Sequence, residues 1–128
     1  MSDKFIVEII SPDQTISKQE TKEVIIPSYE GQMGILNNHI PLITFLRPGI
    51  ITIKAEGEKK YYVEEGTVEF SNNNLLILTS TARDLANFEK SKINEMLQKA
   101  KANLNTVSTD KDRYVASYKL ETLKEISQ

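Results

Sequence analysis

The sequence predicts an α+β protein in which an N-terminal antiparallel β-sandwich is followed by a C-terminal two-helix hairpin. Three observations support this class. Short runs rich in Ile, Val, Thr and Tyr alternate with turn residues up to about Thr81. Neither glycine nor proline occurs from Ala82 to Gln128, where Lys, Glu, Leu, Ala and Gln become common. In that second part, apolar residues recur at helical rather than strand spacing.

About eight strands are expected in the first part. Their sequences, in chain order, are FIVEII, TISKQ, KEVIIP, a run near ITFL, GIITIKA, KKYYVEEG, TVEFS and LLILTST. Runs of this length and composition, separated by Gly, Pro and Asn, are typical of a sandwich or barrel. The connections at Glu56-Gly57 and at Ser71 to Asn74 indicate hairpins, because Gly and Asn tolerate the positive φ of tight turns.

The second part predicts two helices joined by a short polar loop. Asn87 is the expected N-cap of the first helix, with Glu89 in its first turn, and the second helix is expected to begin at Asp110 or Asp112. Two short helices bury little surface, so we expect this hairpin to be the less firmly held part. The apolar stripe of the first helix consists of Ile93, Met96, Leu97, Ala100 and Leu104.

Length and charge exclude several classes of function. The 128 residues suit one domain, or one domain with a small appendage. From the change in sequence pattern we expect a sandwich domain at residues 1–83 and a helical domain at residues 84–128. A formal net charge of −2 provides no basic field, so neither nucleic acid nor direct contact with an anionic membrane is expected. The absence of cysteine excludes disulfides, thiol catalysis and Cys-ligated zinc. No apolar segment approaches the roughly 20 residues of a membrane span, and no targeting signal is recognised at the N-terminus.

The stretch GQMGILNNHIPLI, Gly31 to Ile43, contains the only histidine, His39. A histidine among turn residues can be a general base or a metal ligand. Nucleophilic catalysis has no support, because the sequence lacks both cysteine and a G-x-S-x-G elbow. One histidine with scattered carboxylates does not supply a metal site, and the glycines lack the Lys-Ser/Thr of a phosphate loop. We therefore expect no catalytic residue, metal or cofactor.

Two interpretations of this segment remain open on the residues alone. In the first, Gly31 and Gly34 permit a sharp turn while Pro41 restricts the backbone of the preceding residue. In the second, the segment is a contact surface for another protein. Only the second accounts for the apolar residues crowded against a polar tip, which are Met33, Ile35 and Leu36.

The longer segment PSYEGQMGILNNHIPLITFLRPGIITI closely resembles the epsilon subunits of F-type ATP synthase. Their signature has the form P-x-x-x-G-x-x-G-I-L/Y-x-x-H-x-P-L-x-T-x-L-x-P-G. The resemblance extends from the FIVEIISPDQ opening to the two terminal helices and covers essentially the whole chain. The matching positions are Pro27, Gly31, Gly34, Ile35, Leu36, His39, Pro41, Leu42, Thr44, Leu46, Pro48 and Gly49.

The resemblance implies a non-catalytic central-stalk subunit of a proton-translocating ATP synthase, which couples the gamma subunit to the c subunit ring during ATP synthesis. Such a subunit would lie on the cytoplasmic face of the bacterial inner membrane, held there only indirectly through the complex. The Gly31 to His39 loop would be its docking edge. The implied contacts are Glu30, Gln32, Met33 and His39 with the c ring and Ser11, His39 and Thr44 with gamma, in a loop shaped by Gly31, Gly34, Pro41, Pro48 and Gly49.

An alternative function is an ATP-sensing inhibitory subunit that acts on the alpha and beta subunits through its helices. Some bacterial relatives bind ATP through an I/L-D-x-x-R-A motif at the start of the first helix, where this chain reads Phe88 to Ile93. Only the acid Glu89 and Lys92, in place of Arg, follow that motif. Since Lys lacks the planar fork with which Arg contacts phosphate, we expect weak or no ATP binding.

Overall fold

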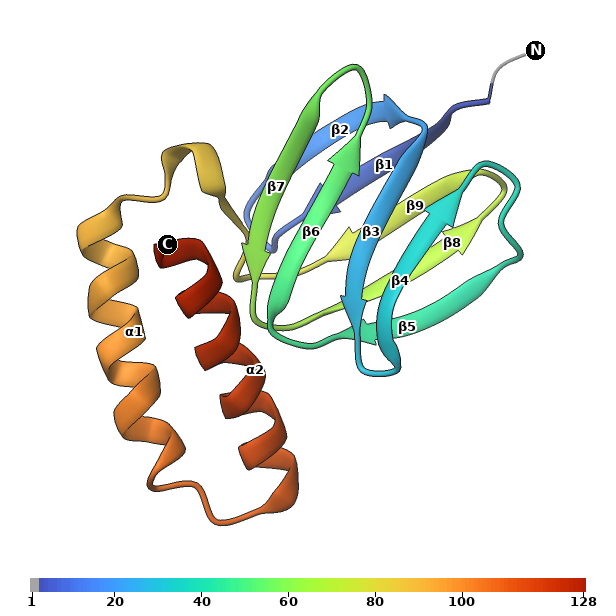
Figure 1. The fold of residues 1–128 in the computed structure, drawn as a ribbon. Coiled ribbons are helices and arrows are strands. Elements are labelled where there is room, and N and C mark those ends of the chain that lie inside the picture. Colours follow the sequence, from blue (N-terminus) through green and yellow to red (C-terminus); the bar gives the residue numbers. More distant parts are fainter. Residues whose placement is uncertain (1–2) are drawn as a thin grey trace. The chain divides into compact units, whose positions relative to one another are not determined.

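Strands make up the first part of the chain and helices the second, in a computed structural model that describes residues 3–128 (Figure 1). The predicted class is therefore confirmed. The chain divides into a unit that ends at Leu85 and a unit Ala86–Gln128. The strands are β1 Phe5–Ile10, β2 Thr15–Thr21, β3 Glu23–Ser28, β4 Gly31–Leu36, β5 Leu42–Leu46, β6 Gly49–Lys54, β7 Glu58–Val63, β8 Gly66–Ser71, β9 Asn74–Leu78 and β10 Arg83–Asp84.

The strands follow one hydrogen-bonded path, β10-β7-β6-β3-β5-β8-β9-β1-β2, with β4 paired to β3 beside it. The two halves of this path meet at a narrow junction, because β3 pairs with β5 at only one position, Ser28 opposite Leu46. The sheet can therefore fold over at β3 so that its halves face each other. One pairing differs from the antiparallel expectation, since β1 and β9 run parallel. A parallel pair needs a long connection, and 63 residues separate Ile10 from Asn74.

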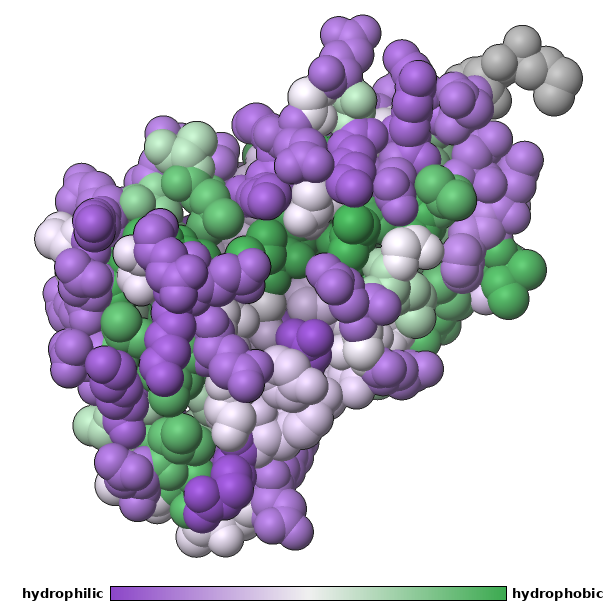
Figure 2. Space-filling model, viewed as in Figure 1, coloured by the Kyte–Doolittle hydropathy of each residue, from purple (hydrophilic) through white to green (hydrophobic). Residues whose placement is uncertain are grey.

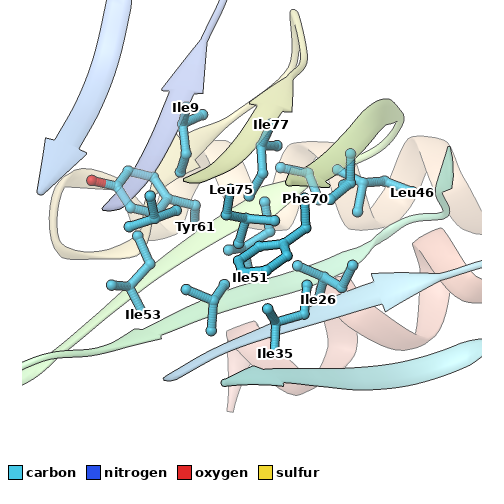
Figure 3. Close-up of a cluster of buried hydrophobic side chains, with 14 of the residues drawn as sticks. Ile9, Ile26, Ile35, Leu46, Ile51, Ile53, Tyr61, Phe70, Leu75 and Ile77 are labelled. Atoms are coloured by element: carbon cyan, nitrogen blue, oxygen red, sulfur yellow. The ribbon is translucent and has the colours of Figure 1, made fainter. Parts of the chain in front are cut away.

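The core lies between the two layers. Figure 3 shows Ile9, Leu75 and Ile77 of one layer directed toward side chains of the other layer, among them Ile51 and Ile53. Alternation along each strand produces this arrangement, because successive side chains point to opposite faces of a sheet. Full burial of each large apolar side chain contributes roughly 1.5–3 kcal/mol, so the sandwich is a firmly held unit.

Two strands were not predicted. The first is β4, whose run GQMGIL holds two glycines and a single β-branched residue, a composition that predicts a loop. It pairs with β3 at six positions, from Glu23 opposite Leu36 to Ser28 opposite Gly31, and this pairing overrides its weak strand propensity. The second is β10, which pairs with Tyr61 and Tyr62 of β7.

The turns agree with the sequence in one case and differ in another. Asn72 and Asn73, between β8 and β9, have φ values of 52° and 57°, as expected for a two-residue hairpin turn. The turn at Glu56-Gly57 joins β6 to β7 without a positive φ at Gly57. Its glycine is therefore not required by the backbone conformation.

Two α-helices, α1 Lys90–Leu104 and α2 Asp110–Ser127, pack against each other in the second unit. α2 begins at Asp110, as expected, whereas the expected cap of α1 is displaced. Asn87 lies in a short 3-10 turn, Leu85–Asn87, and the N-cap of α1 is Glu89, which makes no side-chain capping bond. Thr109 caps α2, because its hydroxyl accepts a 3.0 Å hydrogen bond from the N–H of Asp112. The buried helical residues are Ile93, Ala100, Ala116, Thr122 and Leu123.

Among the described residues, none of the helices combines the length and the apolar character needed to cross a membrane.

Candidate docking surface

The strand β5 is apolar on both faces. Its inward side chains include Thr44 and Leu46, which are 5% and 1% exposed. Between and beside them, Ile43 and Phe45 point outward and are 75% and 58% exposed. Because neither layer of the sandwich covers that side of β5, two large apolar side chains stand in solvent.

Further apolar side chains lie on the same face of the sheet two strands away, in β9. Phe45 lies opposite Thr67 of β8, which in turn lies opposite Leu78 of β9, and Leu78 is 45% exposed. Residues in register point to the same face of a sheet, so these side chains share one surface. Leu76, which is half-buried, joins the same face because Glu69 of β8 lies opposite both Ile43 and Leu76. We call this surface the outer face and define it by Ile43, Phe45, Leu76 and Leu78. The exposed residues Thr67 and Glu69 of β8 lie between the two apolar rows, so the outer face combines apolar and polar groups, as protein contact sites commonly do.

The other layer presents a different surface. Hydrophilic side chains crowd the β6–β7 end of the sandwich (Figure 2). A hollow there is lined by charges of both signs, including Lys22, Lys59, Glu20 and Glu58. Mixed charges in contact with water suit a solvated surface rather than a docking site. The outer face is therefore the stronger candidate.

His39 lies in the loop between β4 and β5 and is held by three contacts. Its N–H donates to the carbonyl oxygen of Leu36 at 3.1 Å, and its Nδ1 donates to the carbonyl oxygen of Ile40 at 2.7 Å. Its ring stands edge-on to Phe70, with 5.9 Å between the ring centroids. Within residues 3–128, no three His, Cys, Asp or Glu side chains gather closely enough to hold a metal ion. These contacts make His39 an anchor of the loop.

The expected docking loop from Gly31 to His39 is not one loop. Gly31 begins β4 and His39 follows its end, and the strand between them spans about 17 Å at the usual rise per residue. The c-ring set is divided accordingly: Glu30 and Gln32 are exposed at the β3–β4 turn, Met33 is half-buried, and His39 is at the opposite end. The four residues therefore lie at both ends of β4 and do not form one loop.

The expected gamma set is also dispersed. Thr44 is buried, and its hydroxyl donates to Oε1 of Glu30 at 3.3 Å, so its exposed neighbours in β5 present the surface instead. Ser11 lies in the β1–β2 turn, where its hydroxyl donates to the carbonyl oxygen of Gln14 at 3.2 Å. Ser11 and Leu78 line a common shallow pocket, so this turn borders the outer face.

The expected shaping residues act in different ways. Gly31 has a φ of +122°, which an L side chain rarely adopts. A Cβ at Gly49 would lie 2.5 Å from Cβ of Pro27, so glycine is needed there for close approach. Gly34 has ordinary strand geometry, and the expected turn at this residue is wrong because β4 runs straight through it. Pro41 is exposed and Pro48 is buried.

The segment that corresponds to the ATP motif lies around the start of α1. Phe88 is half-buried and Glu89 is the exposed N-cap. The ammonium of Lys92 lies 3.8 Å from the carboxylate of Glu95. A hydrogen bond from Lys99, together with the charge of Lys92, holds the pKa of Glu95 below its ordinary value. Lys92 thus already has an anionic partner within its own helix.

Sequence reasoning missed Ile43 and Phe45 as site residues. The signal was present in the run LITFL, in which apolar residues occupy both alternating sets of positions. A strand of this kind is expected to be covered on both faces. Since only one face is covered within the sandwich, the other is available to a partner.

Comparison with known proteins identifies the family. Residues 4–84 match the model of the β-sandwich domain of the ATP synthase delta/epsilon chain. The chain is 45% identical to the ATP synthase epsilon chain of Pelagibacter ubique over an alignment of 130 residues. This alignment covers 99% of this chain and 100% of that protein. It is 36% identical over 109 residues to the mitochondrial ATP synthase subunit delta of Schizosaccharomyces pombe, covering 82% of this chain and 65% of that protein.

Solved structures share the fold. One is a chain in the Euglena gracilis mitochondrial ATP synthase OSCP/F1/c-ring structure, with a TM-score of 0.80 and 21% identity. The superposition covers 100% of this chain and 84% of that chain. A chain in the central stalk/c-ring structure of the Tetrahymena thermophila mitochondrial ATP synthase covers 96% of each, with a TM-score of 0.68 and 16% identity. These structures support the fold, and the family model and the 45% identical relative show that the chain belongs to the delta/epsilon family of ATP synthase subunits.

Proposed function

We propose that this chain is a rotor subunit in the central stalk of a proton-translocating F-type ATP synthase and couples the gamma subunit to the c ring. As a member of its family it is a non-catalytic subunit of the synthase complex. The observation that supports the rotor role is an outward-facing apolar surface on a firmly packed sandwich. Torque transfer needs an adaptor that neither deforms nor slips, and this combination supplies one.

The two partners would contact different parts of the sandwich. The outer face, centred on Ile43 and Phe45, suits an apolar contact with gamma, because such residues gain most when a partner excludes water from them. The polar β3–β4 turn, with Glu30 and Gln32 exposed, suits the polar loops of the c ring. Thr44 would act indirectly, since it holds the Glu30 carboxylate from beneath.

This role places the chain on the cytoplasmic face of the bacterial inner membrane, attached through protein contacts alone. The helical unit would contact the alpha and beta subunits and exert at most weak control over ATP hydrolysis. Its charge supports a modest effect, since residues 84–128 hold eight Lys or Arg and seven Asp or Glu, a net charge of 8 − 7 = +1. Exposed ion pairs contribute only about 0–1 kcal/mol each.

Co-purification tests the proposal directly. An affinity-tagged chain, extracted in mild detergent from the membranes of its native cell, should carry gamma and the c subunit with it. Membranes that contain the tagged chain should also retain proton-driven ATP synthesis. Recovery of the tagged chain without either subunit would refute the rotor function. Recovery with the alpha and beta subunits only would favour the inhibitory alternative.

A further inference from the structure

The β4–β5 loop, residues 37–41, is tied to the β8–β9 turn by a pair of asparagine side chains. The backbone N–H of Asn38 donates to Oδ1 of Asn73 at 2.8 Å. In return, Nδ2 of Asn73 donates to Oδ1 of Asn38 at 3.0 Å. The two residues are 35 positions apart, so this reciprocal pair joins segments that are distant in the sequence. Two hydrogen bonds between the same residues determine orientation as well as distance.

Both asparagines have unusual backbone conformations. Asn38 has a φ of 65° and Asn73 a φ of 57°, values in the left-handed region. Asparagine enters this region more readily than most residues do, because its short side chain finds local hydrogen-bond partners. Each residue thus occupies the apex of its own turn, and its side chain reaches the turn opposite. Asparagine at each position thus both accepts the positive φ of the turn and forms the hydrogen bonds between the turns.

The remaining contacts of the loop are made by His39, beside the apex that the asparagine pair holds. His39 fastens the loop to Leu36 of β4 and to Phe70 of β8. The loop then presents Ile40, which is 74% exposed, just before the first exposed residue of β5, Ile43. The position of Ile40 relative to the outer face therefore depends on how the loop is held.

We propose that Asn38 and Asn73 are positioning residues for docking. Their side-chain pair holds the β4–β5 loop so that Ile40 and the outer face contact the gamma subunit together. This inference rests on the proposed rotor function. A loop that is ordered before binding loses less conformational entropy when the complex forms. The pair acts only through the loop that it holds.

Four variants separate the hydrogen bonds from the backbone conformation. Asn73→Gly removes both bonds, while glycine accepts the positive φ. Asn38→Gly removes only the bond that its side-chain oxygen accepts. Asn38→Asp retains both, because a carboxylate oxygen accepts from Nδ2 of Asn73 and aspartate tolerates the left-handed region. The control is Asn72→Gly in the same β8–β9 turn: its φ is 52°, and within residues 3–128 it supplies only a backbone carbonyl to the hydrogen bonds described here.

Two measurements are made on each full-length variant. The first is hydrogen exchange of the Asn38 and His39 amides in the free chain. The second is the dissociation constant for purified ATP synthase that has been stripped of this chain. Asn73→Gly should accelerate exchange about tenfold and weaken binding roughly 3- to 10-fold, with Asn38→Gly intermediate. Asn38→Asp and Asn72→Gly should match the wild-type chain.

Equal exchange and equal affinity for Asn73→Gly and Asn72→Gly would overturn the proposal. A loss of affinity accompanied by a matching loss of global stability would also overturn it, because the pair would then be merely structural. If the wild-type chain itself fails to bind the stripped synthase, the rotor function falls and the docking role falls with it. That result differs from failure of the inference alone, in which wild-type binding is tight and Asn73→Gly changes nothing.

Discussion

Replacing Phe45 with serine should weaken docking while leaving the isolated chain folded. The Phe45 side chain points away from the core and is 58% exposed, so its removal opens no cavity between the layers. Surface substitutions of this kind usually change the free energy of unfolding by less than about 0.5 kcal/mol. Any large loss of binding would therefore be attributable to the interface.

The size of the effect follows from the exposed area. A large aromatic side chain presents roughly 150–250 Å², and 58% of that leaves about 90–145 Å² for a partner to cover. At about 25 cal/mol per Å² this area is worth roughly 2–3.5 kcal/mol if it is covered completely. Serine retains part of the area and coverage is rarely complete, so we expect a loss of about 1–3 kcal/mol. That range corresponds to roughly 5- to 150-fold weaker binding.

The assay is titration of the stripped synthase with the purified chain, in parallel with urea unfolding of the same preparation. Lys60→Ser, on an exposed position of β7 in the other layer, serves as the control. Ile43→Ser should resemble Phe45→Ser, because both residues belong to the outer face. Binding by Phe45→Ser that equals binding by the Lys60 control would show that the outer face is not the docking surface.

Gly49→Ala should lower the free energy of unfolding by roughly 1–3 kcal/mol, because the methyl would lie 2.5 Å from Cβ of Pro27. Gly34→Ala should lower it less, because its methyl meets only the flexible Glu23 carboxylate, at 3.2 Å. Urea unfolding of both variants compares the two losses. Lys99 and Lys92 lower the pKa of Glu95, so its contribution to the helical unit is complete above the ordinary value of 4.5 and lost as pH falls through the lowered value. Circular dichroism should therefore show a smaller acid-induced loss of helicity for Glu95→Gln. Calorimetric titration of the isolated chain with ATP should show no binding, and a micromolar dissociation constant would favour the sensor alternative. Deletion of the residues after Asn105 should preserve assembly and coupling with a modest rise in ATP hydrolysis, and a many-fold rise would identify the helices as a strong inhibitor.

The fold class was predictable because most elements carry strong local signals. Strands such as β6 and β9 are rich in β-branched and aliphatic residues and are bounded by turn residues. The turn at Asn72 and Asn73 is specified by two residues that accept positive φ. The helical spacing of apolar residues similarly identifies α1, although its cap lies two residues beyond Asn87. In each case the information lies within about ten residues of the element itself.

The features that were missed depend on distant residues. β4 is a strand because β3 offers it a complete ladder, which its own composition does not reveal. In β5, both sets of alternating positions are apolar, so the sequence does not tell whether Thr44 or its neighbours Ile43 and Phe45 face outward. The pairing of Asn38 with Asn73 joins turns that only the folded sheet brings together. Candidate contact residues can thus be found from a motif, but their exposure needs the tertiary structure.

The free energy lost on opening differs between the two units, because they bury different amounts of apolar surface. This difference constrains any control of the synthase by the helices. The sandwich encloses a large apolar core, whereas few apolar side chains, such as Ile93 and Leu123, are buried in the helical unit. Separating α1 from α2 would expose such residues at roughly 1.5–3 kcal/mol for each large side chain. The net charge of +1 offers little in exchange, because exposed ion pairs contribute about 0–1 kcal/mol and are screened by salt. A partner that draws the helices apart must therefore offer apolar surface of its own, and an acidic surface alone would leave the hairpin closed.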